Sequence, residues 1–413
     1  MEFGLIGEKL GHSFSKVIHD YFAPYSYEIK EIPKENFEWF IKNADFKGIN
    51  ITIPYKKEVM PYLDVIDDDA KRIGAVNTVI KKDGKLYGYN TDFSGLRRLI
   101  LKNGFDLEKK KVLILGSGGT SDTAYAVCQS LKAEEIYKVS RNGEVNYENV
   151  KILHPDADFV INTTPCGMYP DNNTSALTLD GFSKLEGVID VVYNPLETKL
   201  VMDAKKRGIK GCCGLYMLVS QAILAGEIFT DSKFSESVFN EAYRYVLSKK
   251  RNIVLTGMAG CGKSTVGRAL SDMLSKDLVD TDDLVIKNES MEIKDIFSDK
   301  GEAYFRDAET QAVKTASERN GVIIATGGGA VLRTENVDFL KSNGIIFFLD
   351  RPIEQIIPTD DRPLSSNRDD LTRRFNERYP VYIKTADAVI DASGSIEDTA
   401  EKILEYLNEN ISY

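Results

Sequence analysis

Cysteine and histidine are scarce in this chain of 413 residues, which contains five cysteines and three histidines. The cysteines show no CxxC spacing, and the histidines form neither an HExxH motif nor a cluster with the cysteines. A structural zinc site needs about four such ligands at characteristic spacings. The sequence therefore argues against structural zinc, and we expect reduced thiols that pack as small hydrophobic side chains. Cys261, inside a glycine-rich loop, is the one cysteine that we expect to be exposed.

Long hydrophobic runs are also lacking. No stretch approaches the roughly 20 apolar residues that span a bilayer, and the first residues, MEFGLIGEKLGHS, contain no basic segment followed by an apolar one. We therefore expect a cytoplasmic protein with no membrane partner. The formal net charge of -10 would repel the nucleic-acid backbone, so we expect no nucleic-acid partner either. The sequence does not indicate an oligomeric state.

Two glycine-rich loops are the most informative features that are present. The first, Gly116-Ser117-Gly118-Gly119-Thr120, follows the apolar run 111–115, and the second, 257–265, follows the apolar run 252–256. Each run predicts a buried strand, and each loop opens a helical pattern. Further strands are predicted at 48–53, 136–139, 159–161, 187–192, 278–279, 321–326 and 344–349. Because these runs alternate with helical segments, the sequence predicts an α/β fold with parallel sheets flanked by helices in both halves.

A domain boundary is predicted near residue 248. Apolar residues at spacings of three and four predict a helical stretch that closes the first domain at 226–247. The polar Ser248-Lys249-Lys250-Arg251 then leads directly into the strand at Asn252, as a short joint. We therefore expect one domain over 1–247 and another over 248–413.

The first loop is typical of dinucleotide binding, although glycine-rich turns also simply end strands. The next strand ends in Ser140-Arg141-Asn142. An acidic residue at this place would bind a ribose 2′-hydroxyl, whereas Arg141 can bind a 2′-phosphate, so the sequence favours NADP over NAD. Asp122, at the start of the following helix, suits the helix dipole but would repel a pyrophosphate. We expect its carboxylate to point outward.

Polar segments interrupt the apolar pattern ahead of the first loop. They are His12-Ser13-Phe14-Ser15, Asn50-Ile51-Thr52-Ile53-Pro54-Tyr55-Lys56, Ala75-Val76-Asn77-Thr78 and Asn90-Thr91-Asp92. These segments resemble the substrate-pocket motifs of the shikimate dehydrogenase family. The resemblance continues through 162–170, 193–198 and 214–222, and it covers residues 1–247.

The resemblance implies a two-lobed α/β dehydrogenase with a Rossmann-type NADP domain. The substrate lobe would comprise about 1–98 plus 225–247, and the NADP-binding lobe about 99–224. Reducing a ketone needs a hydride donor and a proton source at the oxygen, and the resemblance assigns the proton to Lys56 with Asp92 as its partner. By the same resemblance, the substrate is held by Ser13, Ser15, Thr52, Lys56, Asn77, Asp92 and Gln221, and NADP(H) by Gly116, Ser117, Gly118, Gly119, Thr120, Arg141, Tyr193 and Gly214. Taken singly, Lys56 is typical of a surface lysine, Asn77 of a turn and Ser13 of a helix N-cap.

The second loop has the pattern GxxxxGK[ST], in which backbone N–H groups surround nucleotide phosphates. Lys263 would contact the transferred phosphoryl group, and Ser264 would bind Mg2+. The ATP-binding residues predicted here are Gly260, Cys261, Gly262, Lys263, Ser264 and Thr265. In Asp280-Thr281-Asp282, one carboxylate, Asp280, could reach the Mg2+ shell and the other the acceptor hydroxyl. Gly327-Gly328-Gly329 would let a ligand approach bare backbone.

These features resemble shikimate kinase, whose DxD, FRxxE, GGG, RPL and late-arginine motifs occur in that order from 252 to 413. The resemblance implies a P-loop kinase domain with a parallel sheet. Asp282, Arg306, Gly328 and Arg378 would bind shikimate, and Asp282 would orient or deprotonate its 3-hydroxyl. Arg362 would come from a closing lid to neutralise charge during transfer. The stretch 351–361 ahead of this arginine is several residues shorter than usual in the family.

Both resemblances lead to consecutive steps of aromatic amino-acid biosynthesis. The expected activities are NADPH-dependent reduction of 3-dehydroshikimate to shikimate and ATP-dependent, Mg2+-dependent phosphorylation of shikimate to 3-phosphoshikimate. One alternative is a first half that acts on quinate or prefers NAD. Another is a second half that binds shikimate without catalysing its phosphorylation.

Overall fold

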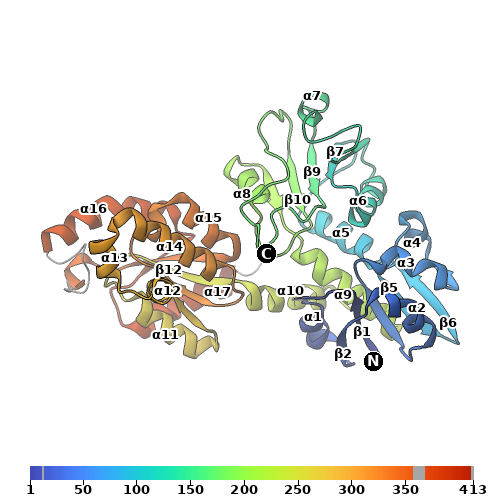
Figure 1. Cartoon of the computed structure of the whole chain (residues 1–413), viewed down its shortest axis with the longest axis horizontal. Helices are drawn as coiled ribbons and strands as arrows, with labels where there is room; N and C mark the ends of the chain where they lie inside the picture. The colour runs from blue at the N-terminus through green and yellow to red at the C-terminus, as the bar shows by residue number, and fades with distance from the viewer. Residues whose placement is uncertain (12–13, 357–367, 411–413) are drawn as a thin grey trace. The chain divides into compact units, whose positions relative to one another are not determined.

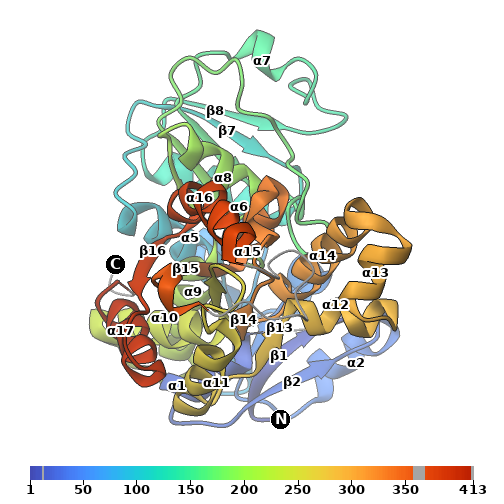
Figure 2. The same ribbon diagram turned by 90° about the vertical axis from the view of Figure 1, so that its left-hand side faces the viewer.

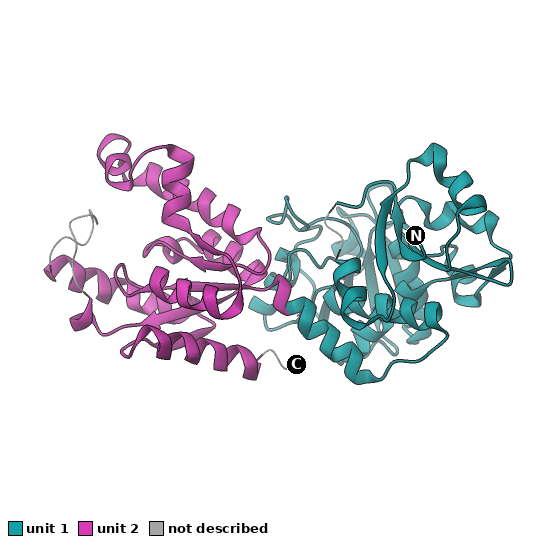
Figure 3. Ribbon diagram, turned by 90° about the horizontal axis from the view of Figure 1, so that it is seen from below, with its two compact units in different colours: residues 1–247 teal, residues 248–413 magenta. Residues whose placement is uncertain are grey.

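The computed structural model describes residues 1–11, 14–356 and 368–410 (Figure 1). The chain divides into two compact units, Met1–Leu247 and Ser248–Tyr413 (Figure 3). Both units combine sheets with flanking helices, so the predicted α/β class is confirmed. No helix among the described residues is long and apolar enough to cross a bilayer.

The first lobe of the first unit is built on a sheet with the strand order β2-β1-β3-β5-β6-β4. The prediction of a parallel sheet was wrong here, because β5 pairs antiparallel with both β3 and β6. Asp83 and Gly84 join β5 to β6 with positive φ angles of 51° and 73°, which suits a two-residue hairpin turn. The elements of this lobe are β1 (Phe3–Gly7), α1 (Ser15–Phe22), β2 (Tyr27–Glu31), α2 (Lys34–Asn43), β3 (Gly48–Ile51), α3 (Tyr55–Glu58), η1 (Met60–Tyr62), β4 (Val65–Ile66), α4 (Asp68–Ile73), β5 (Thr78–Lys82) and β6 (Lys85–Tyr89).

The second lobe has a parallel sheet with the order β11-β10-β9-β7-β8. The chain passes from β7 to β8 on one side and then to β9 on the other. The first glycine loop follows β7 and therefore lies at a topological switch point, where α/β sheets form ligand crevices. The elements are β7 (Lys111–Leu115), α6 (Gly119–Ser130), β8 (Glu135–Val139), α7 (Val150–Leu153), β9 (Phe159–Asn162), β10 (Gly187–Asp190), α8 (Lys199–Lys206) and β11 (Lys210–Cys212).

Two helices that pack against each other, α5 (Thr91–Lys102) and α9 (Leu215–Thr230), lie between the sheets of the two lobes (Figure 1). The single helical stretch predicted at 226–247 was wrong, because α9 ends at Thr230 and α10 spans Glu236–Lys250. The expected polar joint is also helical as far as Lys250. That lysine is fully buried, and its Nζ donates a hydrogen bond to Asn320 Oδ1 at 3.0 Å. A lysine ammonium can be buried when a hydrogen-bond partner compensates the loss of water. This is why part of the basic segment 248–251 belongs to the packed helix and does not form an exposed joint.

The second unit has a parallel sheet with the order β13-β14-β12-β15-β16. All five residues of the central strand β12 are buried, and the chain switches sides at this strand, from β14 to β15. Helices α12, α13 and α14 pack together beside the sheet (Figure 2). The elements are β12 (Asn252–Thr256), α11 (Lys263–Leu274), β13 (Leu278–Asp280), α12 (Thr281–Glu289), α13 (Ile293–Asp299), α14 (Gly301–Ser317), β14 (Ile323–Ala325), η2 (Ala330–Leu332), α15 (Thr334–Asn343), β15 (Gly344–Asp350), η3 (Ile353–Gln355), α16 (Arg368–Thr385), β16 (Ala388–Asp391) and α17 (Ile396–Asn410).

Candidate active sites

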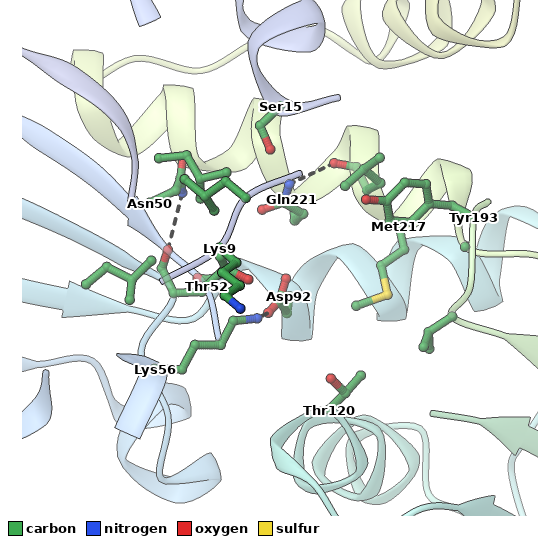
Figure 4. A pocket seen from close by; sticks show the side chains of 17 residues that line it. Lys9, Ser15, Asn50, Thr52, Lys56, Asp92, Thr120, Tyr193, Met217 and Gln221 are labelled. Atoms are coloured by element: carbon green, nitrogen blue, oxygen red, sulfur yellow. Dashed lines mark hydrogen bonds and ion pairs between the residues drawn. The ribbon is translucent and has the colours of Figure 1, made fainter. Parts of the chain in front are cut away.

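A cavity of about 320 Å³ in the first unit brings together side chains from both lobes (Figure 4). The predicted substrate residues that line it are Ser15, Thr52, Lys56, Asn77, Asp92 and Gln221. Ser13 lies outside the described residues. Residues that are distant in the sequence thus line one pocket. Their hydroxyl, amide, ammonium and carboxylate groups can bind a small polar molecule.

An ion pair between Lys56 and Asp92 lies in this cavity, with Nζ 2.6 Å from Oδ2. Lys56 belongs to the short helix α3, whose buried Tyr55 donates a hydrogen bond to Ile32 O at 2.6 Å and so anchors the helix. Asp92 belongs to the first turn of α5, which is capped by the side chain of Asn90. The two side chains are 26% and 16% exposed, so the pair is sheltered yet open to a ligand. The arrangement can deliver a proton and keep the lysine charged and oriented.

The amide of Asn77 is fixed within the cavity wall. Its Oδ1 accepts a hydrogen bond from the backbone N–H of Thr91 at 2.8 Å, and its Nδ2 donates to Thr91 Oγ1 at 3.0 Å. Lys9 and Met217 also line the cavity, and sequence reasoning missed both. Met217 lies in the apolar stretch that starts α9, and that pattern indicates only a core residue. Figure 4 shows its side chain between Asp92 and Tyr193, as an apolar wall of the site.

A larger cavity of about 1170 Å³ lies along the first glycine loop. It is lined by Gly116, Ser117, Gly118, Gly119, Thr120, Ser140 and Arg141, among others. Lys56 and Thr120 line both cavities, so the two hollows meet at these side chains. Tyr193 and Gly214, predicted to bind the cofactor, line the smaller cavity. A dinucleotide along the loop would therefore place its reacting end beside Lys56.

The first glycine loop has room for a phosphate group. A Cβ added at Gly118 or Gly119 would meet no heavy atom within 4 Å, so open space adjoins this backbone. Gly119 begins α6, and the N-terminus of a helix favours an anion. The loop and Arg141 therefore fit a dinucleotide that carries phosphate groups.

Asp122 is neutralised by two lysines. Its Oδ1 lies 2.6 Å from Lys138 Nζ, and its Oδ2 lies 3.1 Å from Lys57 Nζ. Burial opposes ionisation, but the hydrogen bonds from both lysines outweigh it, so the pKa of this carboxyl lies below its usual value. The carboxylate is thus compensated at the helix start instead of acting as an unpaired charge beside a pyrophosphate.

The second glycine loop surrounds the ammonium of Lys263. Its Nζ donates to the backbone carbonyls of Gly257 at 3.0 Å and Met258 at 2.9 Å. Ser264 Oγ donates to Asp280 Oδ2 at 2.7 Å. The prediction of an exposed Cys261 was wrong, because its side chain is 1% exposed and packs in the core of this unit. The sulfur therefore faces the core and not the solvent.

The pairing of Ser264 with Asp280 fits a magnesium ion, since Mg2+ prefers oxygen ligands. Over the described ranges, no three His, Cys, Asp or Glu side chains gather into a group that could hold a metal ion. Mg2+ commonly takes only one or two carboxylates and completes its shell with water and phosphate oxygens. The ion would therefore depend on a bound nucleotide.

Asp282 is a carboxylate of the second unit with little compensation for its charge. Its Oδ1 is buried and has no hydrogen-bond partner in the described part of the chain. Burial raises the pKa of this carboxyl to about 6, with smaller contributions from the charges of Asp280 and Glu309. A buried oxygen without a partner can accept a hydrogen bond from a ligand hydroxyl, and the raised pKa suits proton acceptance.

The three consecutive glycines bring the site residues close together. A Cβ at Gly327 would lie 2.6 Å from Asp282 Oδ1 and 2.7 Å from Glu309 Oε1, and one at Gly329 would collide with Arg306. Side chains of the site therefore occupy the space on the Cβ side of both glycines, and the approach of a ligand to this backbone stays a prediction. At Gly328, the backbone carbonyl instead accepts hydrogen bonds.

Two residues of α16 hold that carbonyl. Arg378 donates to Gly328 O at 3.1 Å, and Tyr382, which the sequence analysis missed, donates to it at 2.5 Å. Arg306, on α14, lies 2.8 Å from Glu309 and 3.1 Å from Glu302. Arg362 and the last five residues of the shortened stretch before it lie outside the described residues. The site thus combines guanidinium groups with an unpaired carboxylate, which suits a ligand that carries both an anionic group and a hydroxyl.

Comparisons with known proteins match both units. A family model described as "Shikimate dehydrogenase substrate binding domain" matches residues 5–79, and one described as "Shikimate kinase" matches residues 259–408. The chain is 38% identical over 262 residues to a shikimate dehydrogenase (NADP(+)) of Clostridium perfringens, a match that covers 58% of this chain and 96% of the relative.

Solved structures of shikimate dehydrogenases are also similar to the first unit. Shikimate dehydrogenase 1 of Peptoclostridium difficile is 37% identical, with a TM-score of 0.55 over 60% of this chain and 98% of that one. A shikimate 5-dehydrogenase of Thermus thermophilus, solved with NADP(H) and shikimate, is 29% identical, with a TM-score of 0.53 over 59% of this chain and 98% of that one.

Proposed function

Because the chain belongs to the shikimate dehydrogenase family and carries a shikimate kinase domain after it, we propose that it catalyses two consecutive steps of aromatic amino-acid biosynthesis. The first is the reduction of 3-dehydroshikimate with NADPH, and the second is the phosphorylation of shikimate with ATP and Mg2+. The observation that carries the proposal is the Lys56–Asp92 ion pair at the junction of the two cavities. A cytoplasmic location is part of the proposal.

The reductive step follows from the placement of the ion pair. NADPH, when bound, supplies the hydride. Lys56 donates a proton from Nζ to the oxygen of the ketone, while Asp92 orients the ammonium. Ser15, Thr52, Asn77 and Gln221 hold the substrate's carboxylate and hydroxyls within the smaller cavity. The substrate lobe is assigned to about 1–98 plus 225–247, and the NADP-binding lobe to about 99–224.

The phosphorylation step depends on positioning and on charge stabilisation. Asp282 accepts a hydrogen bond from the 3-hydroxyl and takes up its proton, while Arg306 and Arg378 bind the carboxylate. Lys263 stabilises the charge that develops on the transferred phosphoryl group. Ser264 and Asp280 would hold Mg2+, which would supply positive charge to the phosphate groups of the nucleotide. The lid role of Arg362 is proposed from its sequence motif alone.

The direct test is to incubate the purified chain with 3-dehydroshikimate, NADPH, ATP and Mg2+ and to identify the products. The full mixture should give 3-phosphoshikimate. Omitting ATP should stop the reaction at shikimate, and omitting NADPH should prevent any turnover of 3-dehydroshikimate. Absence of shikimate-dependent ADP formation would support the alternative in which the kinase-like unit only binds shikimate.

The cofactor preference is tested by replacing Arg141 with alanine. Arg141 lines the larger cavity next to the end of β8, where it can pair with a 2′-phosphate. We expect KM for NADPH to rise by roughly 10-fold or more, while the weaker use of NADH is unchanged, since only NADPH carries the 2′-phosphate. Arg207→Ala is the matched control, because Arg207 pairs with Asp180 at 2.7 Å on the surface of the same lobe. Equal effects on both cofactors, or a wild type that prefers NADH, would favour the NAD alternative.

The pH profile of the kinase tests the role of Asp282. The pKa of this carboxyl is raised to about 6, so the free enzyme carries the reactive carboxylate above this pH and loses it below. We expect kcat/KM for shikimate to fall about tenfold for each pH unit below about 6. Measurements of phosphorylation over that range check this, with the reductase activity of the same samples as a control for folding. A profile that stays flat through pH 6 would contradict proton acceptance by Asp282.

A further inference from the structure

Helix α16 presents two arginines one turn apart on the same face, Arg374 and Arg378. The second is 7% exposed and donates to Gly328 O in the acceptor site. The Nε of Arg374 is buried and has no hydrogen-bond partner among the described residues. A buried guanidinium nitrogen without an acceptor is unfavourable unless a ligand supplies one.

Three carboxylates of helix α14 already pair with arginines other than Arg374 and Arg378. Glu309 and Glu302 pair with Arg306 at 2.8 Å and 3.1 Å. Asp307 pairs with Arg333 at 2.7 Å. Within the described ranges, neither arginine of the α16 pair forms an ion pair with a carboxylate. Both guanidinium groups therefore lack a direct carboxylate partner among the described residues.

The two charges also act on each other. Burial lowers the pKa of Arg374, and the charge of Arg378 lowers it further, whereas Glu302 opposes the shift. Arg374 is therefore near enough to Arg378 and Glu302 for both charges to act on it, and Glu302 also contacts Arg306. Like charges one turn apart on a helix repel each other, and an anion bound between them would remove that repulsion.

We propose that Arg374 is a further substrate-binding residue of the kinase unit, which binds the carboxylate of the acceptor together with Arg378. The inference deepens the proposed function and rests on it. A carboxylate has two oxygens and accepts charge-assisted hydrogen bonds from guanidinium groups in a fixed geometry. With Arg374 in this role, the unit selects acceptors that carry a carboxylate over neutral cyclohexene polyols of the same shape. Asp282, on α12, accepts a hydrogen bond from the hydroxyl that is to be phosphorylated.

The test compares Arg374→Gln with Arg373→Gln in the full chain. Arg373 is the matched control, because it is exposed and pairs with Asp370 at 2.7 Å within its own helix. Kinetics are measured with shikimate and with its carboxamide, which lacks the charge. We expect R374Q to raise KM for shikimate roughly 10-fold or more, with kcat and KM for ATP little changed, and R373Q to behave like the wild type. With the carboxamide, R374Q and the wild type should have similar KM values. Arg374→Lys should recover part of the loss with shikimate.

Several results would overturn the inference. They are an unchanged KM for shikimate in R374Q, an equal loss with shikimate and the carboxamide, or a shift in KM for ATP in place of shikimate. The reductase activity of each variant and its thermal unfolding show whether the chain is folded, and a global fold defect that R374K does not relieve would also count against a binding role. A wild-type chain that does not phosphorylate shikimate in this assay would refute the proposed function itself, and the inference with it.

Discussion

Replacing Lys56 with methionine should lower the rate of 3-dehydroshikimate reduction by roughly 10²- to 10⁴-fold, the usual contribution of general acid-base catalysis. Methionine has a similar length and no transferable proton. The change also leaves the carboxylate of Asp92 without the ammonium that lies 2.6 Å away, so a negative charge would face the substrate. The loss should appear in kcat more than in KM for NADPH, because the larger cavity keeps its loop and Arg141.

The measurement is NADPH oxidation by the K56M variant, with shikimate phosphorylation assayed on the same preparation. The kinase rate should be unchanged. Lys82→Met is the matched control, since Lys82 is 61% exposed on the same lobe and its Nζ lies 3.5 Å from Asp231 Oδ2. Reductase activity close to the wild-type value would exclude Lys56 as the proton donor. Loss of both activities in K56M would instead argue against independent sites.

Replacing Lys263 with alanine should have the opposite pattern, with phosphorylation reduced on the order of 10³-fold and reduction unchanged. The Nζ of Lys263 lies inside the second glycine loop, 3.0 Å from Gly257 O and 2.9 Å from Met258 O. In phosphoryl transfer, the protein contributes mainly by positioning the reactants and stabilising charge, and it forms few covalent bonds itself. Removing a cation beside the transferred group therefore removes a large share of the catalysis. Alanine also leaves those two carbonyls without this donor.

The K263A variant is tested by shikimate-dependent ADP formation at saturating Mg2+ and ATP. Lys287→Ala is the control, because Lys287 is an exposed lysine on α12 of the same unit. We expect the control to keep the wild-type rate. If K263A phosphorylated shikimate at a similar rate, Lys263 would not stabilise the transferred phosphoryl group, and its proposed catalytic role would be wrong.

Local patterns predicted the strands next to both glycine loops. The predicted runs 111–115 and 252–256 have the same bounds as β7 (Lys111–Leu115) and β12 (Asn252–Thr256). Such runs are recognisable because a strand buried on both faces is apolar throughout. The antiparallel β5–β6 pair was missed although Asp83-Gly84 is a hairpin signal. The helical continuation to Lys250 gave no local signal, because the partner of this lysine, Asn320, is 70 residues away.

The sequence by itself determined the chemistry available to this protein: two phosphate-binding loops, the motif residues around them and the order of the two units. These features depend on neighbouring residues, so spacing along the chain reveals them. Only the tertiary structure decided how charges are compensated. It paired Lys56 with Asp92, neutralised Asp122 with Lys57 and Lys138, and buried Cys261. Among the described residues, it left Asp282 Oδ1 and Arg374 Nε without partners. Burial and ion pairing arise from contacts between segments far apart in the chain, and those contacts exist only once the sheets and helices have packed.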